Sequence, residues 1–420
     1  MAIDEVHDRP GSVGAALSHT AFRWVFSGSF ASNIGTWMQN FTLGALADQL
    51  TGKSWFIGLV TFAQLGPTLF LSPLAGVLAD TFDRRKLMVI AATLQTFFSV
   101  ALAILVLHGH PNELVLVLLV GAIGVAGAAN APAANATLPA LVGRNDMPGA
   151  IALNSAQMNL SRVVGPLIAG LVIGLDHPAV IFGINAATYI FVIIAVIVAP
   201  FDARPTGDNT DPPLQRLREG FAAAAADRVI TRVLVTVSVY SFCSLIFIYQ
   251  LAPFARKNLH GDRHTFTLVF SSFGFGAAIG AIAVGTFLIR VHRSALTRWG
   301  LVGFAIALAV LSIQHSAGPA MVAAFFTGVF YFTVITALST VLQERVDDEV
   351  RGRVMGLWMM GWAGLVPLGS LIGGPIIDLS GLTKVFIFGA VVALGLAWYA
   401  DLRAPDDDGP LSAPIEPLLE

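Results

Sequence analysis

Long apolar stretches, separated by short polar loops, form the pattern of this chain. Six of them fall at about 22–48, 55–79, 87–107, 114–138, 150–175 and 178–199, and six more at about 229–254, 265–289, 295–315, 319–343, 352–377 and 384–402. Each reaches the roughly 20 residues that a helix needs to cross a bilayer. The alternation of apolar and polar positions that is typical of membrane β-barrel strands is absent. The pattern predicts an all-α membrane protein with twelve transmembrane helices.

Composition agrees with this prediction and narrows the partners. Of the 420 residues, 55% are hydrophobic and 12% are charged, and the mean hydropathy is +0.75. The net charge is −2 and the basic residues are dispersed among the loops, which argues against a nucleic-acid partner. A single cysteine, Cys243, excludes an intramolecular disulfide. The acidic, polar N-terminus lacks the features of a cleavable secretory signal.

The basic residues are distributed unequally between the two sides of the expected membrane. Of the 24 Lys and Arg residues, 18 fall in the loops and ends of one side, five fall on the other, and Arg162 lies inside a stretch. Short loops rich in Lys and Arg stay in the cytoplasm. We therefore expect a multi-pass protein of the bacterial inner membrane with both termini in the cytoplasm.

Two halves of the chain echo each other at an offset near 200 residues. LPALVGRNDMPGA, from Leu138, recurs loosely as VLQERVDDEVRGR from Val341. Between the halves, turn-forming residues give way to Leu217 and Phe221 at helical spacing, which favours an interfacial helix. We expect an N-terminal six-helix half at 1–205, a cytoplasmic linker with an interfacial helix at 206–228, and a C-terminal six-helix half with a short tail at 229–420.

The most distinctive string is GVLADTFDRRK, a charged loop between the second and third stretches. It resembles the signature loop of the major facilitator superfamily, in which Gly-x-x-x-Asp precedes a basic cluster. The matching residues are Gly76, Asp80, Arg84 and Arg85, whereas positions 81 and 83 depart from the pattern.

Three more strings follow in order: TLPALVGRNDMPGAIALNSA, RVVGPLIAG and RGRVMGLW. Together with the charged loop they make the chain resemble, over nearly its whole length, the drug and siderophore efflux branch of that superfamily, which includes the enterobactin exporter. The resemblance implies two six-helix pseudo-repeat halves that rock about a central site. It also implies gating roles for the motif residues Gly76, Asp80, Arg84, Arg85, Gly165, Pro166, Arg351 and Arg353.

Small residues at four-residue spacing mark surfaces where helices approach closely. In the resembled architecture, helix 5 meets helix 8 and helix 2 meets helix 11 between the halves. We therefore expect such surfaces to slide during transport. The pairs are Gly165 with Ala169, Gly276 with Gly280, and Gly369 with Gly373.

Polar and aromatic residues inside the apolar stretches point to a central cavity, because polar groups are costly in lipid. A cavity with amide and aromatic walls and few charges suits a small amphiphilic substrate. For each residue, ordinary helix packing is the alternative. The candidates are Asn33, Trp37, Asn40, Asn130, Asn154, Arg162, Tyr240, Tyr331, Trp358 and Trp362.

Three charged residues carry specific expectations. Arg162 costs roughly 2.5–3.5 kcal/mol within a span. Its charge must be compensated by an acid of another helix, a backbone carbonyl, water or the negative charge of the substrate. We expect Arg162 to face the cavity and act in substrate or proton coupling, and the alternative is a structural role in which it links helix 5 to a neighbour. Asp48 is the candidate for proton coupling, with a solvated helix-end carboxylate as the alternative. We expect Asp80 to bond Arg84 and the start of helix 11 around Arg351, because its own helix end disfavours an anion.

These observations predict a secondary active transporter rather than an enzyme. The string LADQLTGKS lacks the first glycine of a phosphate loop, and His108 and His110 have no third ligand nearby, so we expect neither ATP nor a metal nor another cofactor. The favoured function is proton-coupled export of a small amphiphilic compound, drug or siderophore-like, by a monomer that alternates access. The alternatives are a facilitator or proton symporter for uptake of an organic metabolite, and a non-transporting receptor or lipid-handling protein.

Overall fold

The computed structural model describes residues 10–109, 111–173, 177–204, 213–288, 291–346, 348–400 and 402. In these ranges the N-terminal part of the chain forms helices α2 (Val13–Ser18), α3 (Thr20–Thr51), α4 (Ser54–Thr81), α5 (Arg84–Leu107), α6 (Glu113–Val142), α7 (Met147–Ile173), α8 (Pro178–Val198) and α9 (Pro213–Ala226).

The C-terminal part contains two long helices that change type along their length. The first consists of α10 (Arg228–Val239), the π-helix η1 (Tyr240–Ser244), the 3-10 helix η2 (Leu245–Gln250) and α11 (Leu251–Lys257). The second consists of α15 (Asp348–Met359), the π-helix η3 (Met360–Gly364) and α16 (Leu365–Ser380). The remaining helices are α12 (Arg263–Thr286), α13 (Arg293–Ser312), α14 (Ala317–Arg345) and α17 (Leu382–Tyr399).

Length and apolarity alone identify ten membrane-crossing helices in the part of the chain that the structure describes. Two more helices, α3 with 32 residues and α7 with 27, are also long enough to cross. Both contain polar residues that lower their apolar character, including Asn40 in α3 and Arg162 in α7. With these two, the described residues form twelve crossing segments, as the hydropathy pattern predicts.

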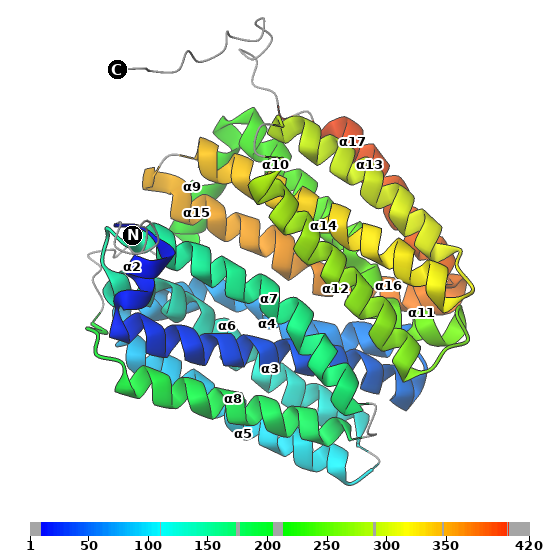
Figure 1. Ribbon diagram of the computed structural model, residues 1–420, viewed down its shortest axis with the longest axis horizontal. Coiled ribbons are helices and arrows are strands. Elements are labelled where there is room, and N and C mark those ends of the chain that lie inside the picture. Colours follow the sequence, from blue (N-terminus) through cyan, green and yellow to red (C-terminus); the bar gives the residue numbers. More distant parts are fainter. Residues whose placement is uncertain are drawn as a thin grey trace, which may run out of the picture.

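The helices form two bundles that lie side by side (Figure 1). Helices α3 to α8 build one bundle, helices α10 to α17 build the other, and α9 lies beside α15. We call these bundles the N-half and the C-half. The end of the molecule at which α3 begins and α17 finishes is called the termini end, and the other is called the opposite end.

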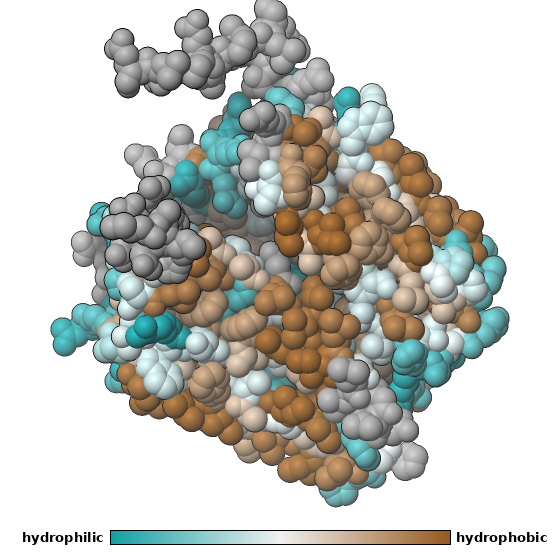
Figure 2. All heavy atoms as spheres, viewed as in Figure 1, coloured by the Kyte–Doolittle hydropathy of each residue, from teal (hydrophilic) through white to brown (hydrophobic). Residues whose placement is uncertain are grey.

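The outer surface of the described helices is strongly apolar. Figure 2 shows hydrophobic side chains over the middle of the visible face and along its lower edge, whereas hydrophilic ones gather mainly at its left and right sides. Leu379 and Trp398 are 91% and 83% exposed, although both are large and apolar. Patches of this kind are rare on soluble monomers but are expected where lipid tails are the solvent.

The glycine pairs singled out in the sequence pack within the halves, so the expectation that they slide between the halves is wrong. A Cβ atom added at Gly276 or Gly280 would lie 1.9 Å or 2.2 Å from a carbonyl oxygen of α14. Likewise, Gly165 lies against α3, and Gly369 lies against Phe242 of η1. These glycines let neighbouring backbones approach inside one bundle, where the helix pair is fixed.

Other glycines mark the contacts between the halves. A Cβ at Gly58 of α4 would lie 2.3 Å from the Ser370 carbonyl oxygen of α16, and one at Gly170 of α7 would lie 2.1 Å from the Thr267 side chain of α12. The helix pairs that meet between the halves are therefore those that the resemblance implies. The glycines that permit the approach are different ones.

Replacement of Gly276 by alanine should destabilise the C-half, because the added methyl group collides with backbone that cannot rotate away. Overpacking of this kind costs about 1–3 kcal/mol. Gly285, on the same helix with open space around its Cβ direction, provides the matched control. We expect a lower melting temperature in detergent for Gly276→Ala than for Gly285→Ala, and equal melting temperatures would contradict this account of the packing.

Candidate functional site

A cavity of about 210 Å³ lies between the two halves. Helices α3, α4 and α7 of the N-half and η2, α12, α14 and α15 to α16 of the C-half contribute to its wall. Five of the predicted cavity residues line it: Trp37, Asn40, Arg162, Tyr331 and Trp362. Their roles in substrate binding remain predictions, but the fold brings these five side chains to one place.

Arg162 lies among aromatic rings from both halves. Its guanidinium carbon is 5.3 Å from the ring centre of Trp37 in the N-half, and 5.1 Å and 4.9 Å from those of Phe332 and Trp362 in the C-half. The negative face of an aromatic ring attracts a cation at such distances. The rings therefore compensate part of the cost of placing this cation in the membrane.

The hydrogen-bonding capacity of Arg162 is left unused. Its Nε is buried without a hydrogen-bond partner, and the side chain makes no ion pair with a described residue. Aromatic rings contact a guanidinium group through its faces, whereas its five N–H groups point outward in its plane. The group is thus partly stabilised, but it still lacks an acceptor.

The neighbouring polar groups also offer donors. The Trp362 indole N–H donates to the Tyr331 hydroxyl over 3.3 Å, which leaves the Tyr331 hydrogen free to donate. The side-chain oxygen of Asn40 accepts from Gln64, so its N–H groups remain. No Asp or Glu is among the described residues that line the cavity. A small, aromatic-walled space with surplus donors is suited to an acceptor-rich, anionic group.

The other five predicted cavity residues do not line this cavity. Tyr240 is fully buried, with its ring centre 4.9 Å from that of Phe304, and Trp358 is 3% exposed in the core of the C-half. Asn154 accepts a hydrogen bond from Gln157 within α7. Asn33 and Asn130 are half-buried elsewhere in the N-half. A role in substrate binding remains a prediction for these five residues; the Asn130 side-chain oxygen and the Tyr240 hydroxyl are buried without a hydrogen-bond partner among the described residues.

Sequence reasoning missed four aromatic residues of the cavity wall: Tyr249, Phe270, Phe273 and Phe332. Tyr249 lies in η2, where the helix is wound as a 3-10 helix. Phe332 follows Tyr331 in the run FFTGVFYF, and this density of aromatic residues in one span was the available signal.

At the opposite end, Asp48 forms a bidentate ion pair that joins the halves. Its two carboxylate oxygens accept from Arg256 Nε over 2.8 Å and from Arg256 Nη2 over 2.7 Å, and Asp48 is only 6% exposed. Beside this pair, Arg263 donates to Gln49 over 2.8 Å. The proton-coupling candidate is therefore a structural partner of a cation from the C-half, rather than a solvated helix end.

A second carboxylate completes this contact in an unusual way. Asp378 of α16 accepts hydrogen bonds from the backbone N–H groups of Ser54 and Trp55, both over 2.9 Å. These are the first residues of α4, and Lys53, which precedes them, makes no side-chain cap. The C-half thus caps a helix of the N-half, where the helix dipole favours an anion.

The motif residues lie at the termini end and in α7. Arg84 donates to the Ala136 carbonyl over 2.8 Å, and Arg85 donates to the carbonyls of Ala199 and Phe201 over 2.8 Å and 2.9 Å. These bonds tie α5 to the interior of α6 and to the residues that follow α8, where carbonyls lack helical partners. In α7, Pro166 lies inside the helix and Gly165 touches α3.

The C-half motif residues make similar local contacts. Arg353 pairs with Glu219 of α9 over 2.9 Å, and Arg351 donates to the Val346 carbonyl over 3.1 Å. Residues 76 and 80 lie in α4, but the structure does not describe their surroundings, so the expected latch of Asp80 to Arg84 and Arg351 and the role of Gly76 stay predictions.

A family model described as transmembrane secretion effector (MFS_3) matches residues 11–412, nearly the whole chain. The chain belongs to this major facilitator family. Among curated relatives, it is 24% identical to the staphyloferrin A transporter of Staphylococcus aureus (strain NCTC 8325 / PS 47), over 87% of this chain and 91% of the relative. It is also 24% identical to the enterobactin exporter EntS of Escherichia coli O1:K1 / APEC, over 81% of each chain.

Solved structures agree on the major facilitator fold. The chain superimposes on a mutant of the nucleoside transporter NupG with a TM-score of 0.74 at 14% identity, covering 90% of this chain and 98% of the other. On an inward-facing, occupied bacterial homologue of the human lysosomal transporter Spinster, the TM-score is 0.71 at 15% identity, with 91% and 97% covered. These relatives and neighbours are transporters rather than enzymes.

The two carboxylates at the opposite end of this major facilitator should hold the halves together there. Loss of a charge-assisted hydrogen bond costs about 1.5–3 kcal/mol, so we expect Asp378→Asn or Asp48→Asn to shift the population toward separated halves by about 10- to 100-fold. Spin labels at Lys53 and Lys257, with Cys243 replaced by serine, would report the distance. Glu113→Gln, an exposed acid at the same end, is the control. Unchanged distance distributions would refute the role.

Proposed function

We propose that this protein exports a small amphiphilic compound, drug or siderophore-like, across the bacterial inner membrane in exchange for protons. The observation that carries the proposal is Arg162, a cation without a carboxylate partner in a cavity walled by rings of both halves. A ligand bound there touches both halves at once. Its binding energy can then depend on how the halves are arranged, as alternating access requires.

The chemistry of the cavity favours an organic anion with an apolar or aromatic part. An acidic group supplies the acceptor that Arg162 and the Tyr331 hydroxyl lack, and the aromatic walls accommodate an apolar body. The names of the relatives, a staphyloferrin A transporter and an enterobactin exporter, support a siderophore-like compound. An inorganic ion would leave the aromatic walls without a matching surface, and a simple sugar carries no negative charge for Arg162.

The coupling follows from the contact at the opposite end. Opening there has to separate Asp48 from Arg256 and Asp378 from the start of α4. We assign the coupling to Asp48: a carboxyl that carries a proton loses its charge-assisted bond to Arg256, so proton binding there is linked to how the halves meet at this end. The excess of Lys and Arg in the loops of the termini end supports a cytoplasmic position for that end. The functional unit in this proposal is a monomer, and the lipid bilayer is its solvent.

Substitution of Arg162 tests the substrate-binding part of the proposal. Arg162→Gln removes the charge and the planar fork, and Arg162→Lys keeps only the charge. Loss of a charge-assisted contact of about 1.5–3 kcal/mol predicts a roughly 10- to 100-fold lower kcat/KM for Gln and a smaller loss for Lys. Arg298→Gln, which alters an arginine bonded to the Ala397 carbonyl within the C-half, is the control.

Transport by the Arg162 variants can be interpreted only together with a measurement of how much protein is folded. Normal elution and melting with lost transport in Arg162→Gln would support a role in the cavity. Full transport by both Arg162 variants would eliminate that role, and loss of folded protein in both would assign Arg162 to the structure alone.

Direction and coupling need an assay in cells. A panel of dyes and siderophores should accumulate less in cells that contain the protein, and this difference should vanish when the proton gradient is collapsed. Asp48→Asn should reduce the gradient-dependent part, because its partner Arg256 then holds a neutral amide. Equal accumulation in all conditions would refute export, and higher accumulation with the protein would favour uptake of an organic metabolite instead.

A further inference from the structure

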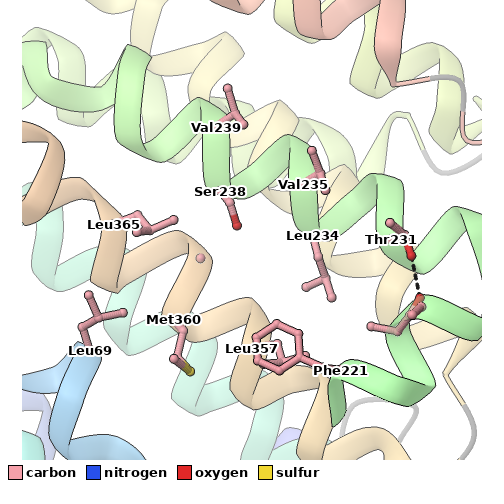
Figure 3. Close-up of a pocket in the computed structure, with 13 residues that line it drawn as sticks. Leu69, Phe221, Thr231, Leu234, Val235, Ser238, Val239, Leu357, Met360 and Leu365 are labelled. Atoms are coloured by element: carbon pink, nitrogen blue, oxygen red, sulfur yellow. Dashed lines mark hydrogen bonds between the residues drawn. The ribbon is translucent and has the colours of Figure 1, made fainter. Parts of the chain in front are cut away.

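A second space, larger and with an uncharged, mostly apolar lining, lies next to the central cavity. This groove of about 440 Å³ is bounded by α9, α10, α15 and η3, with Leu69 of α4 at one end (Figure 3). Its lining includes Leu234, Val235, Leu357 and Met360, and Figure 3 shows Leu234 on the side of α10 that faces Leu357. The Thr231 hydroxyl at its edge already donates to the Ala224 carbonyl over 2.6 Å. The groove offers an apolar chain a surface but offers a charged group none.

The groove and the central cavity are separated by a single helical segment. Met359, Trp362 and Ala363 line the cavity, while Met360 and Gly361 of the same segment line the groove. The dividing segment is the π-helix η3, a local departure from regular winding that often marks functional sites.

The barrier between the two spaces includes one flexible side chain. In α4, Thr68 lines the cavity and Leu69 lines the groove. Leu69 lies against Gly364, where an added Cβ would be 2.6 Å from Leu69 Cδ1. Rotation of Leu69 moves its Cγ and Cδ atoms, whereas its Cβ, 3.1 Å from the same added atom, keeps its place against Gly364. Because α4 and η3 belong to different halves, the two spaces join when the halves shift and these two segments move apart.

The central cavity is small for a complete amphiphile. Its volume of about 210 Å³ lies below the roughly 300–1,000 Å³ that is usual for ligand pockets. It can hold an acidic head at Arg162, whereas the neighbouring groove has the volume and the apolar lining for a tail.

We infer that the two spaces form one bipartite binding site for an organic anion that carries an aliphatic chain. The acidic head binds Arg162 among the aromatic rings, and the chain enters the groove past Leu69 and Gly364 once α4 and η3 have moved apart. This inference rests on the proposed function and adds the class of substrate. The occupant of the groove is the tail of the transported compound, and an acyl chain of a membrane lipid is the competing outcome.

The probe for this test is glycine acylated with a decanoyl chain that ends in a diazirine. The full-length protein in nanodiscs is irradiated with it, and the labelled peptides are identified by mass spectrometry. We expect labels on residues of α10 and η3 that line the groove. Arg162→Gln should reduce these labels by about tenfold or more, because the head loses a charge-assisted contact.

A matched pair of variants tests the groove itself. Val235→Trp fills the groove from a position that is 38% exposed, and Val322→Trp places the same side chain at a 59% exposed position on α14. The first should abolish labelling of the groove and the second should leave it unchanged. Val239→Trp, at a 36% exposed position, replaces Val235→Trp if that variant does not fold.

A neutral probe separates the two occupants. Decanol with the same terminal diazirine has no acidic head, so it should label the groove weakly. Equal labelling by decanol and by the acylglycine, unaffected by Arg162→Gln, would show a lipid acyl site and overturn the inference. No labelling of the groove by the acylglycine would overturn it too.

Transport of the acylglycine in proteoliposomes distinguishes this inference from the proposed function. Arg162-dependent labelling of the groove without transport would leave the bipartite site standing and remove the exporter. Transport without labelling of the groove would do the opposite.

Discussion

A cation held inside the membrane without a carboxylate beside it constrains the whole centre of this protein. Arg162 is surrounded by Trp37, Phe332 and Trp362, and these rings belong to helices from both halves. Any movement that separates the halves therefore withdraws part of the compensation for its charge. The energy of that cation is coupled to the conformation of the transporter, whether or not a ligand is present. A ligand with its own negative charge lowers the free energy of this cation most in the conformation in which the halves, and with them the rings, have separated.

The contact at the opposite end depends on a related constraint. The first amides of α4 lack partners in their own helix, and the carboxylate of Asp378 satisfies two of them from the other half. The nearby pair of Asp48 and Arg256 adds a bidentate bond between the same two bodies. Small residues such as Gly58 make this close approach feasible, since a side chain there would strike the backbone of α16. Polar bonds thus hold the halves together where backbone contact is tightest.

The sequence was sufficient for the spans and for the central cation. Continuous hydropathy marks helices by their length, and a lone arginine inside a span stands out because nothing local compensates it. The face that each helix turns to the cavity was harder to predict. Tyr240 begins η1 and Trp358 lies just before η3, and a π-turn breaks the rotation of 100° per residue on which such predictions depend. Regular periodicity therefore could not place Tyr240, Trp358 or Tyr249.

Contacts between distant parts of the chain could not be predicted from sequence patterns, for a different reason. Asp378 lies 324 residues from Ser54, and neither residue signals the other. The glycine pairs gave a wrong prediction because their spacing indicates that another helix packs closely, but it does not indicate which helix that is. Gly276 has the same spacing whether α14 or α7 lies against it, and only the assembled bundle shows that it is α14.

The cap that Asp378 provides for α4 also affects how the protein is made. Helix α4 is synthesised and inserted long before residue 378 leaves the ribosome, and its first turn has no cap from its own neighbour Lys53. That turn stays open to interfacial water until the C-half arrives and docks. The first turn of α4 therefore obtains these hydrogen bonds only after the C-half has folded against the N-half.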